Sequence, residues 1–310
     1  MLKTLWKHGR LISHNAQWRR IALVLILLAS LGAVLWIIVR DWYNLVTYDW
    51  RFEWGYLALS GVAYIGALAL AIAAWIVIMT GLRARLSWKE HGRYFLYSWM
   101  ARRLPTPAPF VASRVLLYEQ AGVPRRLSLA GMLWEQLLLF ASGGWLVVLL
   151  FPFTPTLSER VPLAPAILLA LICVGLVLQP QVLARGLNWV LRRWKREPLT
   201  TMLTVPGALA ALILHMLLWL SGGVIFFLMV RSIYLINWEL LPVFVQIWVA
   251  SGLIGYISFF VPIIPGVRDM GMIALLTIIV PLSVALIIAL LVRLWITVNE
   301  LFWAVVFSRL

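Results

Sequence analysis

Several titratable side chains fall inside or next to long apolar stretches of this sequence. They are Arg114, Glu135, Arg268, Asp269 and Arg293, together with His215 and Glu300. A charge at the centre of a bilayer costs on the order of a few kcal/mol, so such residues face a polar cavity and pair with one another. Because a guanidinium donates two parallel hydrogen bonds to a phosphate, we interpret the three arginines as an anion-binding path and Glu135 and Asp269 as the groups that hold them.

The same residues have a second interpretation. Arg268 with Asp269, and Arg293 with Glu300, are spaced as structural ion pairs or as charges at the membrane surface. His215 has two interpretations as well, a proton relay or a hydrogen-bonded packing histidine. Proline-rich backbone around Arg268 favours the binding role for that residue.

Two proline clusters interrupt the apolar stretches. The first comprises Pro105, Pro107 and Pro109, and the second comprises Pro262 and Pro265 followed by Gly266. Proline removes a backbone donor and blocks the helix, and in lipid the freed carbonyls need protein or water as partners. We therefore predict that neither 101–112 nor 261–268 is continuous helix, and that each segment is broken or re-entrant and lines a cavity.

The two interrupted regions resemble each other. Leu127-Ser128-Leu129-Ala130 follows the first, and Leu282-Ser283-Val284-Ala285 follows the second. Matched interruptions in two halves indicate an internal repeat with a binding site between the halves. If the first hairpin enters from inside and the second from outside, the repeat is inverted, with six full crossings, two hairpins and both termini inside.

The composition of the chain predicts the kind of fold that must position these residues. Of 310 residues 64% are hydrophobic and 12% charged, which cannot cover a soluble surface. The apolar runs approach 20 residues, as membrane helices require. We predict an all-α, polytopic integral membrane helix bundle of about six to eight spans. We expect residues 21–308 to form a single transmembrane domain. The basic segment at 1–20 is either an interfacial segment or a topology anchor. The expected helices are 21–39, 55–80, 127–151, 163–178, 206–230, 243–261, a half-length piece at 270–280, and 282–307.

The basic residues follow a topological pattern. Of the 26 lysines and arginines, 16 fall in residues 1–20, 83–93, 125–126 and 185–196, whereas the alternate loops hold four. Under the positive-inside rule this bias places the N-terminus in the cytoplasm and the protein in the inner, or plasma, membrane. It also accounts for the net charge of +15 without nucleic acid as a partner.

The sequence offers no catalytic constellation. It lacks H-E-x-x-H, G-x-S-x-G, a P-loop and an acidic metal cluster. We therefore expect no enzyme activity, no metal and no cofactor.

A short motif resembles a known family. Pro-Ile-Ile-Pro-Gly-Val-Arg-Asp at 262–269 is similar to the proline–glycine–arginine element of the lysylphosphatidylglycerol synthase transmembrane, or flippase-like, family. Residues 290–294 around Arg293 resemble its closing arginine helix, and the first proline segment with Arg114 and Glu135 resembles its first half. The chain departs from the pattern at both glycine pairs, and Asp269 stands where glutamate is usual.

The resemblance implies a domain that moves lipids between leaflets. No aminoacyl-transferase domain follows in this sequence, so we do not carry over synthase activity. The leading hypothesis is a translocator of an anionic lipid or a polyprenyl-phosphate-linked lipid. The alternative is a non-transporting subunit that scaffolds partner membrane proteins, and arginines enclosed in helix contacts would favour it.

Overall fold

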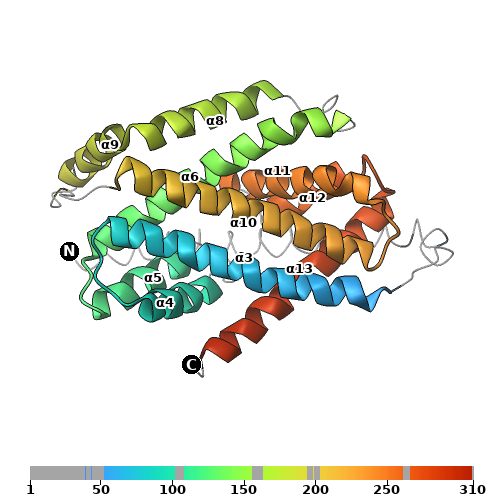
Figure 1. Ribbon diagram of the computed structural model, residues 1–310, viewed down its shortest axis with the longest axis horizontal. Coiled ribbons are helices and arrows are strands. Elements are labelled where there is room, and N and C mark those ends of the chain that lie inside the picture. The colour runs from blue at the N-terminus through green and yellow to red at the C-terminus, as the bar shows by residue number, and fades with distance from the viewer. Residues whose placement is uncertain are drawn as a thin grey trace, which may run out of the picture.

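The computed structural model describes residues 39, 43, 52–101, 108–155, 163–193, 198, 203–260 and 266–308. The predicted helix at 21–39 and the basic segment at 1–20 therefore lie outside the described residues, apart from Val39. The described chain is all-α, as predicted (Figure 1). Its helices are α3 (Trp54–Gly81), α4 (Trp88–Met100), α5 (Ala108–Gln120), α6 (Arg125–Leu150), α8 (Leu163–Leu178), α9 (Pro180–Arg193), α10 (Val205–Arg231), α11 (Leu241–Phe260), α12 (Val267–Leu276) and α13 (Leu282–Ser308), with 3₁₀ turns η2 (Phe151–Phe153) and η3 (Trp238–Leu240).

Within the described residues, five helical stretches are long and apolar enough to cross a bilayer. They are Trp54–Gly81, Arg125–Phe153, Val205–Arg231, Trp238–Tyr256 and Leu282–Trp303. Helix α8 has 16 residues and is therefore about 24 Å long, below the ~30 Å thickness of a bilayer core. The protein is thus an integral membrane protein built as a helix bundle, and α3, α6, α8, α10 and α13 begin and end within a few residues of the predicted bounds.

Two helical hairpins enter the bundle from opposite ends. Helices α4 and α5 have 13 residues each, about 20 Å, and occupy one end of the bundle (Figure 1). Helices α11 and α12 occupy the other end (Figure 1). This is the arrangement expected of an inverted repeat, in which α3, the first hairpin and α6 correspond to α10, the second hairpin and α13. The second hairpin is asymmetric, because α11 has 20 residues and α12 has 10.

Each hairpin has an apolar core of its own. The first core joins the C-terminal part of α3 to the first hairpin and the N-terminal part of α6, through residues such as Trp75, Phe95 and Trp134. The second core joins the C-terminal part of α10 to the second hairpin and the N-terminal part of α13, through residues such as Phe227 and Phe244. Each hairpin therefore packs with the end of the long helix before it and the start of the long helix after it, at opposite ends of the bundle.

Local sequence explains where the hairpin helices begin. The Ser87 hydroxyl accepts a hydrogen bond from the backbone N–H of Glu90, and the Glu90 carboxylate accepts one from the backbone N–H of Ser87 at 2.8 Å, so α4 begins in a capping box. The bond from the Ser87 backbone N–H, with a second from the Ser87 hydroxyl at 2.8 Å, holds the pKa of the Glu90 carboxyl below its usual value. Helix α12 begins after Gly266, whose φ of +92° lies in the left-handed region that glycine adopts without strain.

Two predicted boundaries were wrong. The half-length helix expected at 270–280 is α12, which begins three residues earlier and ends at Leu276. Pro281 disfavours helix in the residue before it, and the chain turns between Thr277 and Val280. The segment 185–196, expected to be a basic loop, is helical over its described part, because α9 extends to Arg193.

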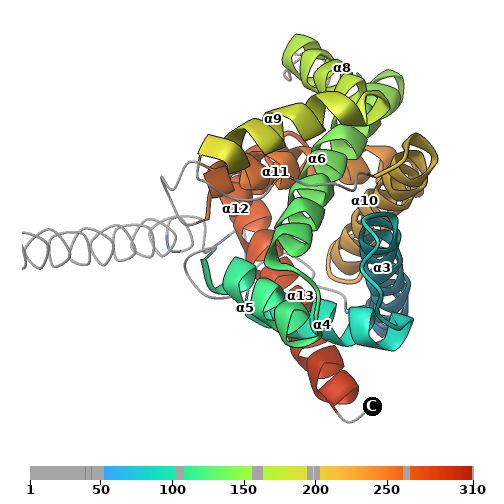
Figure 2. The same ribbon diagram turned by 90° about the vertical axis from the view of Figure 1, so that its left-hand side faces the viewer.

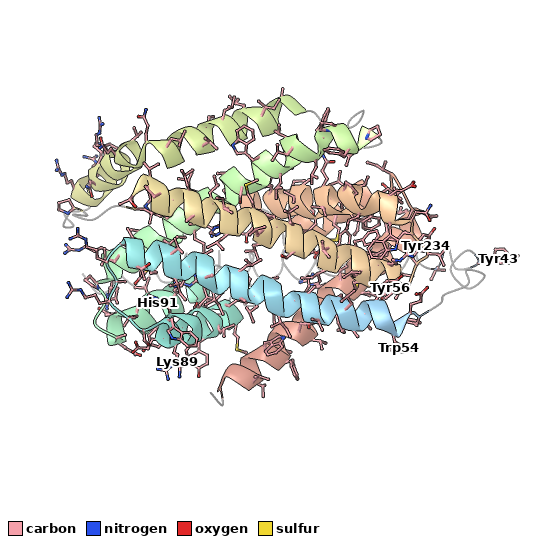
Figure 3. The ribbon with its side chains drawn as sticks, viewed as in Figure 1. Tyr43, Trp54, Tyr56, Lys89, His91 and Tyr234 are labelled. Atoms are coloured by element: carbon pink, nitrogen blue, oxygen red, sulfur yellow. The ribbon has the colours of Figure 1, made fainter. Side chains whose placement is uncertain are left out.

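The basic segments gather at one end of the bundle. Lys89 and His91 lie near the end where α3 finishes and α6 begins, whereas Trp54, Tyr56 and Tyr234 lie at the other (Figure 3). Helix α9 lies at the same end as Lys89 (Figure 1). The described parts of 83–93, 125–126 and 185–193 therefore share one side, as the charge pattern requires.

Candidate functional site

Arg114 and Glu135 form an enclosed ion pair. A guanidinium nitrogen of Arg114, on α5, donates to the Glu135 carboxylate of α6 at 2.7 Å, and the two side chains are 0% and 8% exposed. Arg114 Nε donates to the Ser98 hydroxyl of α4 at 2.9 Å. The pair ties both limbs of the first hairpin to α6, and it lies where no ligand reaches it without a rearrangement of the core.

Aromatic rings surround the guanidinium of Arg114. Its central carbon lies 4.3 Å from the ring centre of Trp75, 4.7 Å from that of Phe95 and 4.7 Å from that of Phe110. Such cation–π contacts stabilise a cation most strongly where water is excluded. This arginine therefore has three aromatic rings and two hydrogen-bond acceptors as protein partners, which is the arrangement of a structural residue.

A second polar set lies one helical turn along α5 from Arg114. The indole N–H of Trp75 donates to the Tyr118 hydroxyl at 2.6 Å, and His91 Nδ1 lies 2.8 Å from the same hydroxyl. These bonds link α3, α4 and α5 within the first core. The first hairpin is thus held by a continuous series of polar and aromatic contacts.

Asp269 and Arg293 form the corresponding pair in the second half. A guanidinium nitrogen of Arg293, on α13, donates to the Asp269 carboxylate of α12 at 3.0 Å. The side chains are 66% and 33% exposed, unlike the enclosed pair of the first half. Both pairs join the second limb of a hairpin to the long helix that follows, but their polarity is reversed.

The sequence repeat aligns these pairs. Arg114 precedes Ser128 by the same number of residues as Asp269 precedes Ser283, and both serines are buried. Glu135 and Arg293 then fall one helical turn apart on α6 and α13, on the same helix face. Each half therefore has an ion pair between the second hairpin limb and the following long helix, with the charges exchanged and the partner on the long helix offset by one turn.

Arg268 packs against α11. The central carbon of its guanidinium lies 4.3 Å from the ring centre of Trp248, and its aliphatic part lies against Gly255, where an added Cβ would come 2.8 Å from Arg268 Cβ. The side chain is half-buried. Arg268 directly precedes Asp269 in α12 and contacts α11, whereas Asp269 pairs with Arg293 of α13.

The structure does not gather the three arginines around one point. Arg114 belongs to the first core, among α3, α4, α5 and α6, whereas Arg268 and Arg293 take their partners from α11 and α12. The predicted anion path therefore divides into an enclosed pair in one half and an exposed pair with a neighbouring arginine in the other.

The proline clusters coincide with helix ends. Helix α4 ends at Met100 and α5 begins at Ala108, with Pro109 in its first turn, where proline is tolerated. Helix α11 ends at Phe260, and Gly266 precedes α12. Pro105, Pro107, Pro262 and Pro265 lie outside the described residues, in the connections between the hairpin limbs.

The contact between the first hairpin and α13 was not predicted from the sequence. Trp99 of α4 donates through its indole N–H to the Glu300 carboxylate of α13 at 3.1 Å, which joins the first hairpin to the second half. His215 Nδ1 lies 2.7 Å from the Ala211 carbonyl oxygen, as expected of a packing histidine. Tryptophans are common at membrane interfaces, so residue type alone did not distinguish Trp75, Trp99 and Trp248 from the others.

Among the described residues, no group of three or more His, Cys, Asp or Glu side chains could hold a metal ion. Comparisons with protein-family models, with curated proteins and with solved structures found no match.

Proposed function

We propose that the protein binds the phosphate of an anionic lipid, or of a polyprenyl-phosphate-linked lipid, at the second hairpin and moves that lipid across the membrane. The observation that carries this proposal is the Asp269–Arg293 ion pair. It is exposed, it joins α12 to a helix apolar enough to cross a bilayer, and it lies beside a helix break at Gly266. A charge pair exposed within an apolar zone is costly unless it faces water or an anion.

In this proposal Asp269 occupies Arg293 when no lipid is bound. A lipid phosphate displaces the carboxylate and takes the two parallel donors of the guanidinium, and the adjacent Arg268 adds positive charge. The pair contributes little stability by itself, because the exposed groups are screened by solvent. Exchange of one anion for another therefore costs little at this position, whereas the enclosed Arg114–Glu135 pair holds the first hairpin in place.

The resemblance to the flippase-like family supports the same assignment. It rests on residues 262–269 and 290–294, which include Arg268, Asp269 and Arg293. This chain lacks the family's glycine pair beside Pro262 and Pro265. We therefore expect its lipid specificity to differ from that of the family.

Reconstituted vesicles test the proposal. We expect Arg293→Ala to slow movement of labelled phosphatidylglycerol by at least about tenfold, the effect of losing a charge-assisted hydrogen bond. Arg293→Lys should restore part of the rate, because lysine keeps the charge but loses the planar fork. Arg268→Ala and Arg268→Lys should show the same order.

The matched control is Arg125→Ala. Arg125 pairs with Glu119 at 2.6 Å, and the two side chains are 64% and 40% exposed, so this variant removes a comparable exposed pair outside the site. It should leave lipid movement at the wild-type rate. Wild-type movement in the Arg293→Ala variant would exclude this phosphate site.

The alternative function is a scaffold for partner membrane proteins. The enclosure of Arg114 favours it, as do the exposed apolar side chains along α13 at Leu290, Leu294, Leu301 and Phe302. The C-terminal part of α13 extends away from the rest of the bundle (Figure 1). If vesicles containing the wild type move neither phosphatidylglycerol nor a polyprenyl phosphate, the scaffold becomes the better assignment.

A further inference from the structure

The sequence of helix α9 carries an amphipathic pattern. In sequence, Gln181, Arg185, Asn188 and Arg192 recur at the spacing of one helix face. Leucine and valine at 183, 187, 190 and 191 recur at the spacing of another. A short helix with separate basic and apolar faces is typical of a segment that lies in the plane of a membrane interface.

The exposed surface of α9 is basic and aromatic. Arg185, Arg192 and Arg193 are exposed, and Trp189 is 69% exposed. The helix contains no aspartate or glutamate between Pro180 and Arg193. Within the described ranges, no ion pair joins these arginines to a carboxylate. A tryptophan among arginines suits the head-group level, where an apolar ring and positive charges are both accommodated.

The position of α9 agrees with an interfacial role. Helix α8 ends at Leu178, and Pro180 begins a helix that turns away from it. Figure 2 shows α8 nearly end-on, while α9 lies across the end of the bundle. This end also carries Lys89, and it is the end to which the positive-inside rule assigns the anionic cytoplasmic leaflet (Figure 3).

We propose that α9 is an interfacial helix that binds anionic phospholipid head groups of the leaflet at the basic end, through Arg185, Arg192 and Arg193, with Trp189 at the head-group level. A topology signal alone requires basic residues but neither a helix, nor separation of its faces, nor an exposed tryptophan. The proposal concerns attachment to the leaflet surface and does not rest on lipid movement.

A spin label at position 186 tests it in the full chain. A Cβ added at Gly186 meets no atom within 4 Å, so Gly186→Cys in a Cys173→Ser background places a nitroxide on α9 without a clash. The label's collision rate with a water-soluble nickel chelate is measured in nanodiscs of phosphatidylcholine, with and without phosphatidylglycerol. We expect phosphatidylglycerol to lower that rate at least about twofold, because the arginines draw α9 into the head groups.

The pair Arg192→Gln/Arg193→Gln should abolish this lipid dependence. The control pair Arg125→Gln/Arg126→Gln removes the same charge at the N-terminus of α6 and should preserve the dependence. High salt should weaken it in the wild type, since exposed charges are screened. Equal collision rates in both lipids, or equal loss of the dependence in both double variants, would overturn the proposal.

Discussion

At the residue scale, the two ion pairs show how burial assigns different roles to the same chemistry. Arg114–Glu135 lies within an aromatic core, and Asp269–Arg293 is exposed. A buried charge that loses its partner remains desolvated, whereas an exposed charge regains water. Both pairs join a hairpin to the long helix that follows it, so removing the carboxylate from each pair in turn tests whether their roles differ.

We expect Glu135→Ala to lower the free energy of unfolding by about 3–5 kcal/mol, because it leaves the buried Arg114 without its carboxylate. Asp269→Ala should change that free energy by about 1 kcal/mol or less. Thermal unfolding in detergent, followed by tryptophan fluorescence, measures both. An unfolding temperature for Glu135→Ala equal to that of the wild type would show that the pair does not hold the first hairpin.

At the element scale, the second hairpin packs closely against α10. A Cβ added at Gly223 of α10 would come 2.7 Å from the backbone Cα of Val245 on α11, and one at Gly222 would meet the indole of Trp248. Backbone cannot move aside as a side chain can, so these glycines let α10 and α11 approach. The same packing positions Trp248, on which Arg268 rests.

Gly223→Ala should therefore lower the free energy of unfolding by about 1–3 kcal/mol, the cost of overpacking a core. The matched control is Gly66→Ala, also within a long apolar helix, where an added Cβ meets nothing within 4 Å. Alanine favours helix over glycine, so this variant should be neutral or slightly more stable. If both variants unfold at the same temperature, the close contact with Val245 is not a determinant of stability.

At the scale of the whole molecule, two units of helix–hairpin–helix lie antiparallel, with α3 packed beside α10. The basic segments of the described chain share one end, and Trp54 and Tyr56 mark the other (Figure 3). This arrangement predicts opposite membrane sides for residues that flank α3. It also places the two hairpins on opposite sides of the membrane.

Single cysteines test this topology in a Cys173→Ser background. An impermeant thiol reagent added outside intact cells should label Phe52→Cys, which precedes α3, and should leave Lys89→Cys, which follows it, unlabelled until the membrane is opened. Both side chains are exposed, so access depends on the side of the membrane rather than on burial. The opposite labelling pattern would invert the map.

Sequence alone determined the class of the protein and most of its elements. Apolar length predicted α3, α6, α8, α10 and α13, and the proline clusters predicted where the hairpins break, because lipid requires helices to satisfy their backbone and proline prevents it. The weak repeat in Leu-Ser-x-Ala also indicated two related halves. Helix α9, however, was not predicted. Its arginines indicated a cytoplasmic loop, because basic residues mark the cytoplasmic side whether or not they lie on a helix.

Only the tertiary structure decided which charges belong together. In sequence, Arg114, Arg268 and Arg293 are equivalent arginines in apolar surroundings. Their partners lie mostly on the preceding or following helix, and the helix packing placed Arg114 among Trp75, Phe95 and Phe110 while leaving Arg293 exposed. The cost and the role of a charge depend on its solvent and its neighbours, and these are properties of the fold rather than of residue type.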